Sequence, residues 1–458
     1  MHPTRFSARA RRAFPMLLAA AIIALGAIPG VARAQDAAEL RAEIEALNAK
    51  VRELAAKLEA LEAAQKAKQE PEKKEPSKPA ASVSAGERGF SLQSADGDFQ
   101  LRLRALVQAD GRFYADDADL GGTDTFLIRR SRIELAGTLF KKFQFRLLPD
   151  FGGTSTTLVE AWLEWAHSPE FRLQVGKTKI PVGLERYQSS ENRLFAETGY
   201  VTALVPNRDI GIDVLGTLAD GRLDYYAGVF NGISDGGTSI TDASDDKSVA
   251  LRLFTHPFAK SQNAALKGLG FGLAATFGDE VGAPPVYRTV AQQTFFSWRA
   301  NVLADGATER VVPQGYWFVG PFGAIVEYAI SEQEVRSAAG SGGLRKLENE
   351  ALNLSLTWVL TGEDASFRGV KPAGKSGAWQ LSARYTALDV DDDAFPVFAD
   401  PARSATEARS LGVGLSWWAN AQIRFYLDYY QTELENQDAS LPERDDEQIA
   451  VLRAQYRF

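Results

Sequence analysis

The chain of 458 residues contains no cysteine and only three histidines, His2, His167 and His256. It therefore has no disulfide, no thiolate metal site and no cysteine nucleophile, and little imidazole for acid–base or zinc chemistry. After residue 34 it also lacks any run of 18 apolar residues, so we expect no transmembrane helix. Its 51 basic residues are outnumbered by 59 acidic ones, which argues against a nucleic-acid binder. We expect no cofactor, no metal and no catalytic set.

The first 34 residues have the pattern of an export signal. Arginines precede an apolar run from Met16 to Ile28, and Ala32-Arg33-Ala34 fits a signal-peptidase site. A membrane anchor is the alternative, but it needs about 20 apolar residues and this run is shorter. We predict a cleaved signal peptide over residues 1–34.

Residues 35–65 predict an α-helical coiled coil. Apolar residues recur at alternating spacings of four and three, at Leu40, Ile44, Leu47, Val51, Leu54, Leu58 and Leu61. That spacing keeps one apolar seam along a helix and favours self-association. The alternative is a single amphipathic helix that lies on another surface. Residues 66–89 contain three prolines and few apolar groups, which predicts a flexible linker.

From Phe99 onward the apolar residues alternate with polar ones, as in half-buried strands. We predict a first strand from Phe99, a last strand that ends at Phe458, and fourteen others near 125–139, 142–151, 157–167, 170–180, 209–218, 222–230, 247–255, 268–278, 308–319, 322–335, 349–362, 376–390, 407–418 and 422–434. Short connections alternate with long ones, and the last strand ends on an aromatic residue. These features are typical of outer-membrane barrels.

The predicted fold is therefore all-β, a 16-stranded antiparallel transmembrane β-barrel over residues 90–458. A soluble β-sandwich or propeller is the alternative, but such folds bury their apolar faces. Several aromatic residues fall where a barrel needs its interfacial girdle: Trp162, Trp165, Trp317, Trp358, Trp417, Trp418, Tyr429 and Tyr456. The expected location is the outer membrane of a Gram-negative cell, in contact with lipid.

Over about 90–458 the sequence resembles the phosphate-selective porin O and P family. The resemblance rests on short motifs in matching order: Leu127-Ile128-Arg129-Arg130-Ser131-Arg132-Ile133, the segment from Val175 to Glu185, Asn207-Arg208-Asp209-Ile210-Gly211, Pro313-Gln314-Gly315-Tyr316-Trp317 and Gly320-Pro321-Phe322-Gly323. It implies a homotrimeric sixteen-stranded channel whose third loop folds inward, and some relatives carry an N-terminal coiled coil. The solute does not transfer with the fold.

If the apolar alternates face lipid, one lumen wall carries a series of arginines, which we predict to be an anion path: Arg102, Arg104, Arg130, Arg132, Arg146 and Arg172. Guanidinium groups two residues apart on a strand lie roughly 7 Å from each other, close enough to pass an oxyanion along. The alternative is that these arginines pair with acids such as Glu134, Asp150, Glu160 and Glu164 and brace the wall.

The long segment 181–208 is the expected constriction loop, with Arg186, Arg193 and Arg208 as candidate lining. Glu185, Glu191 and Glu197 nearly balance its charge, which weakens the case for a strong phosphate site.

Lys177 and Lys179 are also constriction candidates, although strict alternation turns them toward lipid. We favour a bulge at Gly176 or a strand end over snorkelling at the rim. The acidic segment 389–393 is interpreted as a solvated loop rather than a Ca²⁺ site.

The sequence therefore predicts a non-enzymatic outer-membrane porin for passive diffusion of small anions, with phosphate or polyphosphate as candidate solutes. One alternative is a weakly selective general porin. Another is a barrel that anchors a periplasmic coiled-coil tether, in which conduction is incidental.

Overall fold

A computed structural model describes residues 36–68, 81–86, 89–115, 122–238, 244–337, 343–437 and 444–458. The predicted signal peptide lies outside these residues. The chain divides into two compact units, Met1–Ser77 and Lys78–Phe458. Across the described ranges, no helix has both the length and the apolar character that a membrane span requires.

The first unit contains one helix, α1 (Asp36–Lys68). From Ile44 to Leu61 the side chains of the heptad seam are exposed on it, including Leu47, Leu54 and Leu61, each more than 60% accessible. The predicted helix is confirmed, and the coiled coil stays a prediction.

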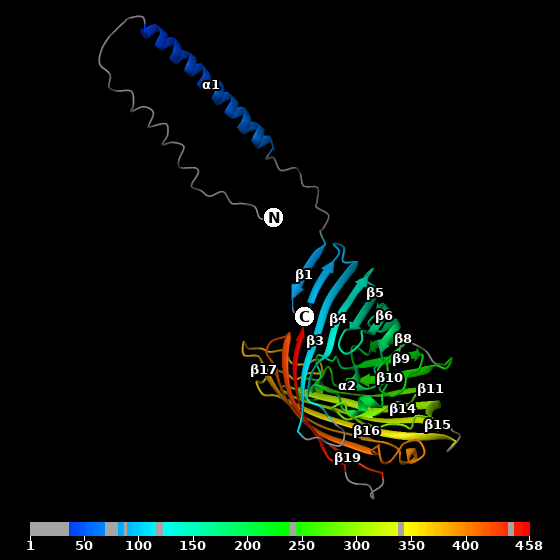
Figure 1. Cartoon of the computed structure of the whole chain (residues 1–458). Helices are drawn as coiled ribbons and strands as arrows, with labels where there is room; N and C mark the ends of the chain where they lie inside the picture. The colour runs from blue at the N-terminus through cyan, green and yellow to red at the C-terminus, as the bar shows by residue number, and fades with distance from the viewer. Residues whose placement is uncertain are drawn as a thin grey trace. The chain divides into compact units, whose positions relative to one another are not determined.

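The second unit contains a closed antiparallel barrel of sixteen strands, which confirms the predicted fold (Figure 1). Consecutive strands are hydrogen-bonded neighbours, and β20 pairs with β3 to close the ring. The barrel strands are β3 (Phe99–Tyr114), β4 (Thr125–Leu139), β5 (Phe143–Asp150), β6 (Thr157–Ser168), β7 (Phe171–Lys179), β8 (Arg208–Leu218), β9 (Leu223–Phe230), β10 (Ser248–Thr255), β11 (Leu269–Gly282), β14 (Val302–Val319), β15 (Phe322–Ser337), β16 (Leu344–Val359), β17 (Ala378–Asp389), β18 (Glu407–Trp418), β19 (Ile423–Glu435) and β20 (Glu447–Arg457).

The alternation of residue types along each strand explains why the ring closes with a polar interior. On β19, Phe425 and Leu427 are exposed on the outside, while Arg424 and Asp428 are buried inside. An outer apolar face suits lipid, and closure leaves no strand edge with unpaired backbone groups.

One end of the barrel has mostly short connections and the other has longer ones. The long-connection end holds residues 180–207, with α2 (Leu184–Tyr187) and η1 (Tyr200–Ala203), and the hairpin of β12 (Tyr287–Arg288) and β13 (Thr294–Phe296). It also holds η2 (Asp392–Ala394). Two connections at the short-turn end are longer than the rest: residues 256–268, with α3 (Ala264–Lys267), and residues 360–377.

Two details differ from the sequence prediction. The segment predicted as linker contains β1 (Ser82–Gly86), which pairs with β2 (Gly89–Gln93), and β2 extends the sheet beside β3. β20 pairs only with the C-terminal part of β3, so the backbone of its N-terminal part is open to β2. This backbone pairing outweighs the low apolar content of the segment. In addition, Trp162 and Trp418 do not join the aromatic girdle, because Trp162 lines a lumen cavity and Trp418 is buried inside.

Candidate functional site

Residues 180–207 form a loop inside the barrel, here called the inward loop. Its apolar side chains are almost completely buried, including Phe195, Val201 and Leu204. These residues pack against the inner wall as a small core, which a loop on the barrel rim would not do. The third long connection therefore folds inward, as the resemblance implied.

Wall arginines hold the backbone of the inward loop. Nη1 of Arg424 donates to the carbonyl oxygen of Arg193 at 2.7 Å, and Nη1 of Arg384 donates to that of Glu197 at 2.9 Å. Asp428 accepts the backbone N–H of Ala196 at 2.7 Å. Hydrogen bonds to charged side chains in a low-dielectric interior are among the stronger ones, so the loop is fixed in one position.

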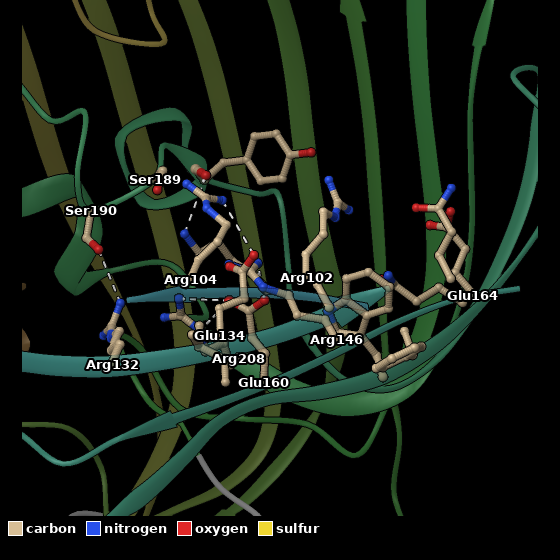
Figure 2. A pocket seen from close by; sticks show the side chains of 18 of the residues that line it. Arg102, Arg104, Arg132, Glu134, Arg146, Glu160, Glu164, Ser189, Ser190 and Arg208 are labelled. Atoms are coloured by element: carbon tan, nitrogen blue, oxygen red, sulfur yellow. Dashed lines mark hydrogen bonds and ion pairs between the residues drawn. The ribbon is translucent and has the colours of Figure 1, made fainter. Parts of the chain in front are cut away.

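Two cavities of the lumen lie beside the inward loop and are lined partly by its residues. The turn-side cavity has a volume of about 510 Å³ and lies toward the short-turn end (Figure 2). The loop-side cavity has a volume of about 520 Å³ and is bordered by residues of the long loops. Arg132, Ser190 and Arg208 line both cavities, so the two spaces adjoin at these three side chains.

The loop-side cavity has a large excess of positive charge. Its lining contains two carboxylates and seven arginines: Arg129, Arg130, Arg132, Arg186, Arg193, Arg208 and Arg288. Both carboxylates are already engaged, since Glu197 contacts Arg112 and Arg129, each at 2.7 Å, and Asp235 contacts Arg310 at 2.5 Å.

Four arginines of this cavity have no carboxylate within 4 Å among the residues that the structure describes. One is the exposed Arg288, which donates to the carbonyl oxygen of Gln292. The others, Arg130, Arg186 and Arg193, are buried or half-buried. Arg130 donates only to the amide oxygen of Gln108, at 2.7 Å. Arg186 donates to the carbonyl oxygen of Thr202, and the Nε atoms of Arg186 and Arg193 are buried without an acceptor in the described ranges. Burial and neighbouring arginines lower the pKa of Arg193 to about 10, so it still carries its charge at neutral pH.

Glu197 neutralises the opposite side of the inward loop. Burial by itself would raise the pKa of Glu197, but the guanidiniums of Arg129 and Arg453 outweigh that effect and hold this pKa well below its usual range. Its carboxylate therefore stays ionised and joins β3, β4 and β20 to the loop through Arg112, Arg129 and Arg453.

The turn-side cavity is more evenly balanced, because its arginines and acids pair across the wall. Arg146 contacts Glu134 at 2.5 Å and Glu160 at 2.7 Å, and Arg208 contacts Glu160 at 3.0 Å. Arg104 contacts Glu134 at 3.4 Å. This wall therefore follows the bracing alternative that the sequence left open.

Two arginines of the turn-side cavity are less engaged. Arg172 lies 3.8 Å from Glu164, which is a long ion pair. Arg102 is exposed to the cavity and reaches no hydrogen-bond or ion-pair partner within the described part of the chain (Figure 2). By contrast, Arg132, which also lines this cavity, forms a close ion pair with Asp150 at 2.7 Å.

The structure brings together ten of the eleven residues predicted for the anion path and the constriction, and each lines one or both cavities. Lys179 is among them, and its Nζ donates to the carbonyl oxygen of Gln188 at 3.2 Å. Lys177 is the exception, since it is buried but lines neither cavity. Gly176 has a φ of +125°, but it pairs with Trp162 and Gly211 without a register shift, so the expected bulge is absent at this position. Lys179 is the last residue of β7, which agrees with the expected strand end.

Sequence reasoning missed Arg129 because alternation places it on the lipid face. In the structure, Gln108 pairs with Arg130 and Ala109 pairs with Ile128, so Arg129 is the extra residue of a β-bulge. As a result of the bulge, Arg129 and Arg130 both line the loop-side cavity. The available signal was a run of four consecutive polar residues, Arg129 to Arg132, because a regular strand does not place such a run on a two-sided wall.

Comparisons with known structures agree with the fold. The outer membrane channel DcaP of Acinetobacter baumannii is similar, with 13% identity, a TM-score of 0.51, and coverage of 81% of this chain and 99% of that one. OmpT, an outer membrane protein of Vibrio cholerae, is similar at 12% identity and a TM-score of 0.50, covering 79% of this chain and 98% of its own. A trimer form of OmpT is similar at 10% identity and a TM-score of 0.50, and the match covers 79% of this chain and 99% of the OmpT chain. No curated protein matches the chain.

The model of the family described as phosphate-selective porin O and P matches residues 99–458, which is most of the chain. The match begins at the first residue of β3 and ends after β20, so it spans the whole barrel. A closed barrel with a constricting inward loop and a polar lumen is a channel of the outer membrane and not an enzyme. The chain belongs to the phosphate-selective porin O and P family.

Proposed function

We propose that this porin conducts small anions and that the loop-side cavity sets its selectivity. The observation that carries the proposal is the group of three buried or half-buried arginines that have no carboxylate partner in the described ranges, Arg130, Arg186 and Arg193. A lumen ring of fixed positive charge attracts anions and repels cations. Arg132 and Arg208, which line both cavities, continue the positive field toward the turn side.

Phosphate is a candidate solute because planar guanidinium groups suit oxyanions. Three partly buried arginines around one cavity offer several donors to one anion. The arginines of the turn-side cavity are mostly paired with carboxylates, so they bind inorganic phosphate weakly and allow it to leave. Strong binding on one side and weak binding on the other is a workable arrangement for conduction.

The experiment is a block of single-channel chloride current by inorganic phosphate, in the wild-type protein and in an Arg130→Gln, Arg186→Gln double variant. We expect phosphate to reduce the wild-type current at millimolar concentration and the double variant to need at least about tenfold more phosphate. A wild-type current that phosphate leaves unchanged contradicts phosphate as a solute. Equal permeability to chloride and potassium contradicts anion selectivity altogether and favours the general-porin alternative.

We also propose that the protein is a homotrimer in the outer membrane and that α1 associates with copies of itself. The trimer form of OmpT has a similar barrel and supports the first part. The exposed apolar seam of α1 supports the second, because Ile44, Leu47, Val51 and Leu54 lose their contact with water only when another helix covers them. Charge also agrees, since Lys57 of one helix faces Glu62 of a parallel partner in this heptad register.

A further inference from the structure

The wall of the turn-side cavity contains an aromatic ring in a row of charged residues. The strand register aligns Arg102 with Ala136, Ala136 with Arg146, Arg146 with Trp162, and Trp162 with Gly176. Trp162 lines the cavity, whereas its neighbour Leu163 is exposed on the outer face. An indole on a lumen wall is costly in water unless a solute uses its apolar face.

The groups around this indole leave it accessible to a solute. Gly176, on the next strand, has no side chain with which to cover the ring. Glu164 follows Trp162 by two residues and so faces the same side of β6. Its Oε1 atom is buried without a hydrogen-bond partner in the described part of the chain, while its Oε2 atom lies 3.8 Å from Arg172. A hydroxyl donor on a solute would satisfy that oxygen.

The cationic end of the row is Arg102. No described residue pairs with its guanidinium, and the side chain points into the cavity (Figure 2). Ala136 separates it from Arg146, so no bulky side chain fills the wall between the two arginines. Three strand spacings, about 14 Å, separate the backbones of Arg102 and Trp162. Arg146 lies between them in the register but is already paired with Glu134 and Glu160, so Arg102 is the cation of this row that has no partner among the described residues.

We propose that the turn-side cavity binds a phosphorylated sugar. In this arrangement, the sugar ring lies on the indole of Trp162, a ring hydroxyl donates to Glu164, and the phosphate lies at Arg102. Inorganic phosphate has no apolar face and gains nothing from the indole, so the cavity favours the sugar phosphate over the bare anion. This inference rests on the proposed anion channel and specifies the class of solute that it takes.

The test compares glucose 6-phosphate, inorganic phosphate and glucose as blockers of chloride current through the reconstituted full chain. We expect glucose 6-phosphate to block at a concentration about fivefold lower than inorganic phosphate. In a Trp162→Leu variant that advantage disappears while block by inorganic phosphate is unchanged, and in a Trp162→Phe variant the advantage is retained. An Arg102→Gln variant, at a position exposed to the cavity, weakens block by glucose 6-phosphate without touching the indole.

Equal block by both phosphates in the wild-type protein overturns the inference, and so does a Trp162→Leu variant that weakens both equally. Block by glucose as strong as that by glucose 6-phosphate assigns the cavity to neutral sugars and also overturns it. A failure of the anion-channel proposal is distinguishable, because it removes chloride selectivity in the absence of any blocker.

Discussion

Replacement of Arg193 by Gln tests how far a single unpaired arginine sets ion selectivity. Arg193 is 5% exposed, lies in the inward loop and lines the loop-side cavity. Its backbone carbonyl, and not its side chain, is the group that Arg424 holds. The substitution therefore removes one positive charge and leaves the attachment of the loop intact.

The expected effect follows from the electrostatic energy of a permeating ion. A monovalent ion about 7 Å from a guanidinium gains or loses about 0.6 kcal/mol even at the dielectric constant of water. Removal of the charge changes the energies of chloride and potassium by this amount in opposite directions. The chloride-to-potassium permeability ratio should then fall about sevenfold, and by more if the cavity has a lower effective dielectric constant.

The assay is the reversal potential of the variant in a planar bilayer under a KCl gradient. The matched control is Arg409→Gln, which removes the same charge from an exposed arginine that pairs with Glu407 and Glu435 on β18 and β19. We expect the control to leave the permeability ratio unchanged. A ratio that stays the same in Arg193→Gln, or falls equally in both variants, refutes the assignment of selectivity to the loop-side cavity.

Four further predictions follow from individual residues. Because arginines lower the pKa of Glu197, its ionised form stabilises the loop above the unfolded pKa of about 4.3, and that stabilisation is lost only as pH falls through the folded-state pKa. The difference in closure rate between a Glu197→Gln variant and the wild type should therefore stay constant from about pH 8 to about pH 5, and an earlier decline of this difference would contradict the reasoning. A Glu197→Gln variant should show frequent spontaneous closures in single-channel records at neutral pH, because the substitution leaves the buried Arg112 and Arg453 without their carboxylate partner. Steady currents in this variant would show that other contacts hold the loop. Gly176→Ala should lower the free energy of unfolding in urea by about 1–3 kcal/mol, because a Cβ there lies 2.3 Å from the carbonyl oxygen of Ala161, whereas Gly374→Ala should have no effect. In a chain without native cysteine, Leu54→Cys should form disulfide-linked dimers under oxidation, and a monomer under the same conditions would argue against a parallel coiled coil.

Strand positions could be predicted from the sequence because a barrel wall has only two sides. Lipid selects apolar residues on the outside and the lumen selects polar ones, so period-two alternation is strong in β18, whose bounds agree with the prediction. Some short turns are likewise encoded locally, as at Gly221, where φ is +87°.

The parts that could not be predicted depend on contacts distant in sequence. The bulge at Arg129 arises from its pairing with β3, and the position of the inward loop depends on Arg384, Arg424 and Arg453, which lie roughly 190 to 260 residues away along the chain. Whether a lumen arginine is paired also depends on the register between strands. The sequence therefore left the basic path and the braced wall as alternatives. In the structure the turn-side wall is braced, and the loop-side cavity has arginines without a carboxylate partner among the described residues, which supports the basic path as a proposal.

The reversal potential of the wild-type protein across a KCl gradient tests the central claim most directly. Arg130, Arg186 and Arg193, which are buried or half-buried and lack a carboxylate partner in the described ranges, predict a potential close to the chloride limit. A potential near zero, or one shifted toward potassium, would contradict an anion-selective lumen.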